Sequence, residues 1–159
     1  MSCIAIIESN IYHWIKYHYV KRLKARWRLK KVGVLNRDIS EVIASMGHND
    51  MLVIADAGLP IPDGVQRIDL ALRKDVPGFL ITVETILQEL HVEKAYIARE
   101  TFSISPYIGK QLRELLEGVQ IIDVNHDELK QLSSHAKAVV RTGEFTPYAN
   151  VILVSGVIF

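Results

Sequence analysis

The sequence predicts an α/β fold: a single-domain layered structure with a central, mostly parallel sheet flanked by helices. Two observations predict it. Short apolar runs typical of strands alternate with segments in which apolar residues recur every three or four positions, as in helices. The 159 residues, of which 49% are hydrophobic and 23% charged, are also enough for one domain with a sizeable core.

The first predicted elements surround one apolar strand. The run MLVIA at 51–55 is short and apolar, which is typical of a strand buried in a sheet. Residues 38–46 before it predict a helix, for which Asp38 or Ser40 is the expected N-cap. After it, RIDLAL at 67–72 alternates between apolar and polar residues, as a half-buried strand does.

The rest of the chain continues this alternation. Apolar residues at three- and four-residue spacing predict the next helix, and a proline opens the one after it, because proline suits the first turn of a helix. In order we expect a helix over 79–90, a strand at 94–98, a helix from Pro106 to about Glu117, a strand at 119–124, a helix from Asn125 or His126, and β-rich segments at 137–143 and 149–159.

Charge divides the chain into a basic leader and an acidic body. Residues 1–31 carry eight Lys/Arg against one acid, net +7, whereas residues 32–159 carry eleven against seventeen, net −6. An acidic body argues against a nucleic-acid ligand, because phosphate binding needs clustered Lys/Arg. The leader lacks the order of a secretory signal, and its apolar stretch is too short and too polar to span a bilayer.

We therefore expect a basic N-terminal extension at 1–29 and one domain at 30–159. The extension has three interpretations: an amphipathic basic helix that touches membrane or nucleic acid, a disordered tail, or upstream sequence that is not normally translated.

The sequence lacks the motifs of several common enzyme chemistries. It contains no glycine-rich phosphate loop, no HExxH or CxxC metal spacing and no GxSxG elbow. Cys3 is the only cysteine, which rules out an internal disulfide and a cysteine-based zinc site. We expect no cofactor and no metal.

Polar residues at strand ends are the candidates for a site, because α/β folds bind ligands there. His48 precedes the strand at 51–55 and Asp56 follows it, while Tyr148 and Asn150 stand at the entrance to the last strand. His126 follows the strand expected at 119–124 and lies near the start of a helix.

Each candidate also has a purely structural interpretation. His48 is a turn residue, Asp56 can cap a turn through its side chain, and His126 can be a first residue of a helix. Arg141 and Glu144 are expected to pair with each other, as nearby opposite charges do. Taken one at a time, these residues do not decide a function.

Taken together, a series of longer motifs resembles the D-ribose pyranase family. The resemblance runs from about Lys30 to Phe159, essentially the whole body. It is carried by GVLN (33–36), MGHND (46–50), DAGLPIPDG (56–64), RIDLAL (67–72), NHDEL (125–129), RTGEFTPYANVIL (141–153) and GVIF (156–159).

The resemblance implies an enzyme that interconverts the β-pyranose and β-furanose forms of free D-ribose. It implies that His48 is the proton donor and that Asp56, His126, Tyr148 and Asn150 bind the sugar. It further implies a cytoplasmic, metal-free, ring-based homodecamer with sites near subunit boundaries. Two alternatives remain open: a mutarotase for another sugar such as fucose, or a non-catalytic sugar-binding accessory of ribose uptake.

The sequence departs from the family pattern in four places. Met46 stands where leucine is more usual and Asn49 where threonine is usual. The stretch RETFSISPY at 99–107 is polar and helix-breaking where relatives carry a more regular segment. Residues 1–28 have no counterpart. Leu29 stands at the usual starting position of relatives, which favours a start codon that can be read as leucine.

Overall fold

A central sheet organises the unit formed by Gly33–Phe159. The computed structural model describes residues 30–157, so the interpretations of the basic extension fall outside the described residues. Within that range the strands are β1 (Met51–Ala55), β2 (Gln66–Asp69), β3 (Val92–Ala98), β4 (Gln120–Val124), β5 (Ala138–Arg141) and β6 (Val151–Ser155).

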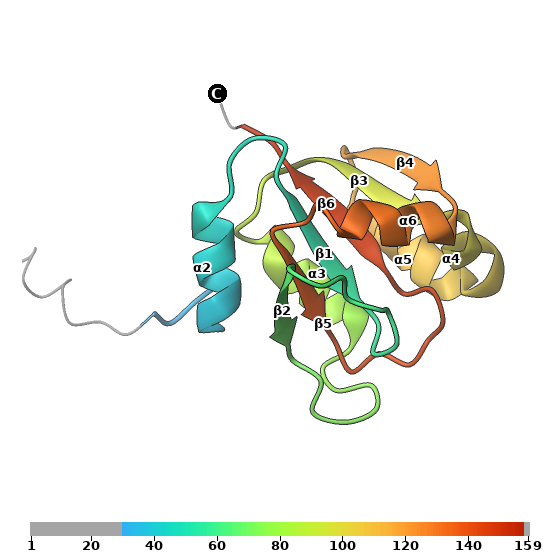
Figure 1. Ribbon diagram of the computed structural model, residues 1–159, viewed down its shortest axis with the longest axis horizontal. Helices are drawn as coiled ribbons and strands as arrows, with labels where there is room; N and C mark the ends of the chain where they lie inside the picture. Colours follow the sequence, from blue (N-terminus) through green and yellow to red (C-terminus); the bar gives the residue numbers. More distant parts are fainter. Residues whose placement is uncertain (1–29, 158–159) are drawn as a thin grey trace, which may run out of the picture. The chain divides into compact units, whose positions relative to one another are not determined.

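The sheet is mixed but mostly parallel, as predicted. Its strand order is β2-β5-β1-β6-β3-β4 (Figure 1). The neighbouring pairs β2–β5, β5–β1 and β3–β4 are parallel, whereas β6 runs antiparallel to both β1 and β3. The C-terminal strand thus lies in the middle of the sheet, between two strands that precede it by many residues.

Helices cover both faces of the sheet. The described helices are α2 (Arg37–Ser45), α3 (Phe79–Leu87), α4 (Arg99–Ile104), α5 (Pro106–Leu115) and α6 (His126–Ser133). Because side chains alternate along a strand, Leu52 and Ile54 of β1 pack with α2, α3 and α5, while Val53 and Ala55 pack in a second core with Leu129 of α6. None of these helices combines the length and apolar character that crossing a bilayer requires.

Helix ends are decided by hydrogen bonds that the periodicity alone does not reveal. The N-cap of α2 is Asn36, whose side chain accepts the Ile39 N–H at 3.0 Å, so the expectation of Asp38 or Ser40 is wrong. Ser40 instead donates its hydroxyl to the Val34 carbonyl. The helix after β4 begins at His126, one of the two predicted starts.

The segment 99–107 is helical, contrary to the expectation of a helix-breaking stretch. Arg99–Ile104 form α4, the chain bends at Ser105, and Pro106 begins α5. The polar side chains that suggested an irregular segment bond to a distant loop. Thr101 donates its hydroxyl to the Tyr148 carbonyl at 2.7 Å, and Ser105 donates to the Pro147 carbonyl at 2.6 Å. Their polarity therefore serves tertiary contacts next to the candidate site.

Candidate active site

A cleft of about 610 Å³ opens at the edge of the sheet where β1, β5 and β4 end. It is lined by residues 56–60 after β1, by His126 and Lys130 of α6, and by Arg141 and residues 144–148 around the end of β5. Loops at the carboxyl ends of parallel strands are where α/β folds bind ligands. The cleft thus gathers three of the predicted residues: Asp56, His126 and Tyr148.

Asp56 is held in the cleft by a reciprocal pair of bonds with Asn150. The Asn150 side chain donates to Asp56 Oδ2 at 2.9 Å and accepts the Asp56 backbone N–H at 3.0 Å. The other Asp56 oxygen accepts the Gly58 N–H at 2.9 Å. Asn150 is only 1% exposed and is not among the residues that line the cleft. In this chain Asn150 therefore fixes the orientation of the Asp56 carboxylate.

His126 and Tyr148 lie next to each other in the lining of the cleft. Their rings meet edge to face, with centroids 4.9 Å apart and planes at 82°. Burial, and then the positive charge of Lys130, lower the pKa of His126, although carboxylates such as Glu100 oppose this. At neutral pH the imidazole is therefore uncharged, with one ring nitrogen as a donor and the other as an acceptor.

Glu100 of α4 lies behind His126. Its Oε1 accepts the His126 backbone N–H at 3.3 Å. Its Oε2 and the His126 Nδ1 are both buried without a hydrogen-bond partner among the described residues. Unpaired buried polar atoms are rare, and here both lie on one pair of residues that already share a bond.

The backbone at Tyr148 adopts a left-handed conformation, with φ of 61°. Such a φ is uncommon for a residue with a side chain and persists only where surrounding contacts impose it. The bonds from Thr101 and Ser105 to the carbonyls of residues 147 and 148 supply those contacts. α4 thus determines how the aromatic ring enters the cleft.

Glu144 organises the loop that leads to Tyr148. One carboxylate oxygen accepts the Thr146 hydroxyl at 2.6 Å and the Thr146 N–H at 3.0 Å, and the other accepts the Phe79 N–H at 3.2 Å. Burial tends to raise the pKa of Glu144, but these bonds outweigh it and the pKa is lowered. The carboxylate is therefore ionised at neutral pH and ties the loop to the start of α3.

The expected pairing of Arg141 with Glu144 is wrong. Arg141 Nη1 binds both carboxylate oxygens of Asp69, at 2.9 and 3.1 Å, and its Nε donates to the Ala57 carbonyl at 3.0 Å. Asp69 and Arg141 stand opposite each other in the register of β2 and β5. Strand pairing, rather than closeness in sequence, selects the partner.

We expect Glu144→Gln to destabilise the fold by about 1–3 kcal/mol at neutral pH, because several partly buried bonds lose a charged acceptor. Since the folded pKa is lowered, the stabilisation by the carboxylate is present above its ordinary value of 4.5 and is lost as the pH falls through the folded value. Urea unfolding of both proteins between pH 3 and 7 checks this. A difference that persists at pH 3 would contradict it.

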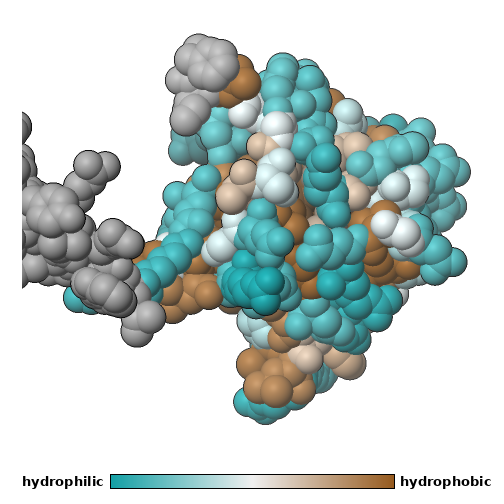
Figure 2. Space-filling model, turned by 60° about the vertical axis from the view of Figure 1, so that its left-hand side comes forward, coloured by the Kyte–Doolittle hydropathy of each residue, from teal (hydrophilic) through white to brown (hydrophobic). Residues whose placement is uncertain are grey.

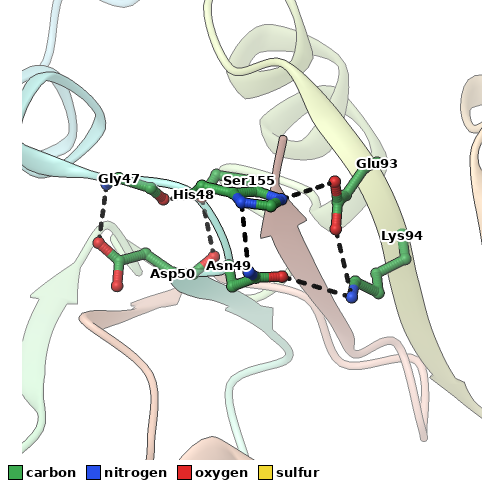
Figure 3. Close-up of polar contacts among 7 residues, drawn as sticks. All are labelled: Gly47, His48, Asn49, Asp50, Glu93, Lys94 and Ser155. Carbon is green, nitrogen blue, oxygen red and sulfur yellow. Dashed lines mark hydrogen bonds and ion pairs between the residues drawn. The ribbon is translucent and has the colours of Figure 1, made fainter. Parts of the chain in front are cut away.

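His48 lies at the opposite edge of the sheet, in the turn that leads into β1 (Figure 3). Its Nε2 contacts Glu93 Oε2 at 3.0 Å, and its Nδ1 contacts the Asn49 amide nitrogen at 3.3 Å. β1 has five residues, and at about 3.3 Å per residue it separates the two edges by about 16 Å. Within one chain the structure therefore does not bring His48 together with the cleft.

The model of the RbsD / FucU transport protein family matches residues 29–158, most of the chain. The chain belongs to this family. A relative named D-ribose pyranase from Symbiobacterium thermophilum is 58% identical over 131 residues, which are 82% of this chain and 100% of the relative. The structure of Bacillus subtilis RbsD complexed with D-ribose is 46% identical, covers 82% of this chain and 100% of its own, and has a TM-score of 0.80.

A second branch of similar structures concerns another sugar. The fucose mutarotase from Streptococcus pneumoniae, solved in complex with L-fucose, is 25% identical with a TM-score of 0.68, and covers 82% of this chain and 100% of its own. For this member of the RbsD / FucU family, both identity and TM-score are thus higher against the ribose complex.

Residue-by-residue reasoning missed three residues around this family member's cleft: Glu100, Thr101 and Ser105. All three lie in the segment expected to be irregular, where the clue was a cluster of polar residues between a strand and a proline. No group of three or more His, Cys, Asp or Glu residues within 30–157 is arranged to hold a metal ion.

Proposed function

We propose that this chain is a D-ribose pyranase, an isomerase that interconverts the β-pyranose and β-furanose forms of free D-ribose and so supports ribose utilisation. The observation that carries this function is the 58% identity over the full length of a relative named D-ribose pyranase. The cleft at the carboxyl edge of the sheet, with charged, aromatic and apolar side chains in its lining, has the size that a small sugar requires.

The reaction needs two proton transfers. As the ring opens, the ring oxygen takes up a proton and the anomeric hydroxyl gives one up, and closure through another hydroxyl reverses both transfers. General acid–base catalysis by a side chain typically accelerates such steps by about a hundred- to ten-thousandfold. Histidine suits a reversible reaction because both of its protonation states are populated near neutral pH.

In this proposal the cleft binds the sugar. Asp56 accepts hydroxyl hydrogens through a carboxylate that Asn150 and Gly58 hold in place. Tyr148 offers a ring face and a phenol. The uncharged His126 offers a hydroxyl partner, and either His126 or water removes the anomeric proton.

His48 acts as the proton donor, and we propose that it reaches the cleft of a neighbouring copy of the chain. The support is its position about 16 Å from the cleft edge of its own chain, the length of the five-residue β1. Apolar side chains on the surface support association: Figure 2 shows hydrophobic areas within the mainly hydrophilic face, and Leu35, Leu72, Ile81, Tyr107 and Phe145 are among the exposed large residues.

The family resemblance favours a ring-based homodecamer located in the cytoplasm, with residues 30–159 as the pyranase domain and residues 1–29 as an extension. Mass measurement by light scattering tests the subunit number directly.

The function is tested by NMR exchange between the pyranose and furanose anomeric signals of free ribose, with the full chain present and absent. L-fucose in place of ribose is the parallel arm. Accelerated ribose exchange supports the proposal. Acceleration of fucose alone would make the chain a mutarotase of the second branch, and binding of ribose without acceleration would make it an accessory protein.

We expect Tyr148→Phe to weaken ribose binding about tenfold, the loss of roughly one hydrogen bond. The ring and its edge-to-face contact with His126 remain, so the fold is unchanged. Isothermal titration with ribose, together with urea unfolding, checks both statements. Unchanged ribose affinity would mean that the Tyr148 hydroxyl does not contribute to ribose binding.

A further inference from the structure

His48 belongs to a closed circuit of four side chains at the amino edge of β1. We infer that this circuit fixes the ring proton of His48 on Nε2, so that Nδ1 is the nitrogen that exchanges a proton with the sugar, and that Glu93 is the positioning residue that holds it so. This inference rests on the proposed catalytic role of His48. The circuit joins His48, Glu93, Lys94 and Asn49 (Figure 3).

Lys94 decides how the side-chain amide of Asn49 is oriented. Its ammonium group has donors only, and it contacts Glu93 Oε1 at 3.2 Å and Asn49 Oδ1 at 3.4 Å. Asn49 must therefore present its oxygen to Lys94. Its amide nitrogen then faces His48 Nδ1, at 3.3 Å.

This orientation of the Asn49 amide decides which ring nitrogen of His48 carries the proton. An amide NH₂ is a donor, so the Nδ1 that it faces must be an unprotonated acceptor. The ring proton then sits on Nε2, where Glu93 Oε2 accepts it at 3.0 Å. The other neutral tautomer would set Nδ1–H against the amide of Asn49 and leave the Nε2 lone pair against a carboxylate.

Glu93 is ionised at neutral pH in this arrangement. The hydrogen bond from His48 and then that from Lys94 lower the pKa of Glu93. A carboxylate on Nε2–H stabilises the imidazolium that forms whenever Nδ1 takes up a proton, and it keeps the ring in one orientation. Lys94 in turn holds Glu93 and Asn49 at once.

The backbone that carries His48 is fixed to the sheet. Ser155 at the end of β6 accepts the Asn49 N–H at 3.0 Å and donates its own N–H to the Asp50 carbonyl at 2.9 Å. The Ser155 hydroxyl also bonds to the Gly47 carbonyl. Asn49 has a φ of 67°, a conformation that asparagine tolerates and β-branched residues such as threonine do not. Asparagine thus fits both the turn and the circuit.

The sugar enters the circuit at the longer of the two contacts that the His48 ring makes, the one to Asn49. Asn49 gives way to the sugar oxygen, while the shorter contact to Glu93 persists. The reaction starts from the imidazolium form of His48, in which Nδ1 has taken up a proton from water while Nε2–H stays bonded to Glu93. On ring opening the bond between the anomeric carbon and the ring oxygen breaks, its electron pair goes to the ring oxygen, and the Nδ1 proton moves to that oxygen, which leaves the neutral ring protonated on Nε2. The anomeric hydroxyl becomes the carbonyl as its proton passes to a base. On closure the attacking hydroxyl returns a proton to Nδ1, and the base returns its proton to the carbonyl oxygen.

Two further charged groups, Asp50 and Lys137, lie at this edge. Asp50, in the same turn, accepts the Gly47 N–H at 2.8 Å and pairs with Lys137 at 3.5 Å. Of the described residues, Glu93 and Asn49 contact the His48 ring, and Lys94 contacts both of them.

The test records ¹⁵N signals of the histidine rings in the full chain, with His48 identified by the signals lost in His48→Ala. We expect a protonated Nε2 and an unprotonated Nδ1 in the neutral ring. Asn49→Asp keeps the size and tolerates the same φ, and its introduced carboxylate should move a proton onto Nδ1. Glu93→Gln should mix the two tautomers and lower kcat by about 10- to 100-fold, with KM nearly unchanged because Glu93 does not contact the sugar.

Glu117→Gln is the matched control, since it removes the charge of an exposed glutamate far along the chain, two residues beyond the end of α5. It should change neither the His48 signals nor kcat. A protonated Nδ1 in the unchanged protein, or a Glu93→Gln variant with the original tautomer and kcat, would overturn the inference. Retained turnover in His48→Ala would instead overturn the catalytic role of His48, and the tautomer measurement stays separate from that outcome.

Discussion

Replacing His48 by alanine should lower ribose exchange by at least about a hundredfold, the typical contribution of a positioned general acid–base group. Ribose binding should remain measurable, because the residues that line the cleft lie at the other edge of the sheet. The side chain of His48 is 48% exposed, so its removal leaves no buried cavity and the fold should persist. NMR exchange and isothermal titration measure the two effects separately.

Mixing variants tests whether His48 acts across a subunit boundary. His48→Ala keeps an intact cleft, and Asp56→Ala keeps an intact histidine. If each site combines a cleft and a histidine from different chains, co-expression of the two inactive variants in equal amounts should restore about a quarter of the sites, since each half is intact half of the time. If each site lies within one chain, no mixture can regain activity.

Converting Asn150 to aspartate should damage both folding and binding. The substitution removes the donor that bonds to Asp56 at 2.9 Å and sets a second carboxylate against the first, in a position only 1% exposed. Leaving a buried charge uncompensated costs about 3–5 kcal/mol. We expect a loss of that order in urea unfolding at neutral pH, together with loss of ribose binding.

The pH dependence of Asn150→Asp has a defined sign. Burial and the neighbouring carboxylate raise the pKa of the introduced group, so the penalty is present above that raised value and shrinks as the pH falls below it. Urea unfolding at pH 7 and pH 4 measures the change. A penalty that grows on acidification would contradict the expected contact between the two carboxylates.

Exchanging the two residues separates folding from binding. In the double variant Asp56→Asn with Asn150→Asp, an amide at 56 can donate to a carboxylate at 150, which still accepts the backbone N–H of residue 56. The Gly58 N–H keeps its oxygen acceptor as well. We expect stability to recover in part while ribose binding stays weak, because the charge has moved away from the cleft. Full recovery of binding would mean that the charge at position 56 is not needed.

Much of the fold could be predicted because its signals are local. The run at 51–55 is apolar in every residue and forms β1, buried on both faces. The helix before it ends within one residue of its predicted limit, and Pro106 begins α5 as expected. Asn125 caps α6 with a reciprocal bond to Glu128, an arrangement contained in four consecutive residues.

For the candidate site, too, the local features could be predicted and the long-range contacts could not. Its position at strand ends is visible in the sequence, since Asp56 directly follows an apolar run. The bonds that shape it join distant residues: Asp56 and Asn150 are separated by 94 positions, and Thr101 and Tyr148 by 47. The polar segment before Pro106 looks irregular by itself and becomes helical because its hydroxyl groups find acceptors in the loop at 147–148.

The sequence by itself therefore determined the alternation of strands and helices, the mostly parallel sheet, and the resemblance that points to a sugar isomerase. Only the tertiary structure decided that β6 lies between β1 and β3, that Arg141 pairs with Asp69, and that His48 stands at the edge opposite the cleft. The physical reason is the distance along the chain over which these interactions act. Periodicity and capping act over a few residues, whereas strand pairing and buried hydrogen bonds choose partners by position in space.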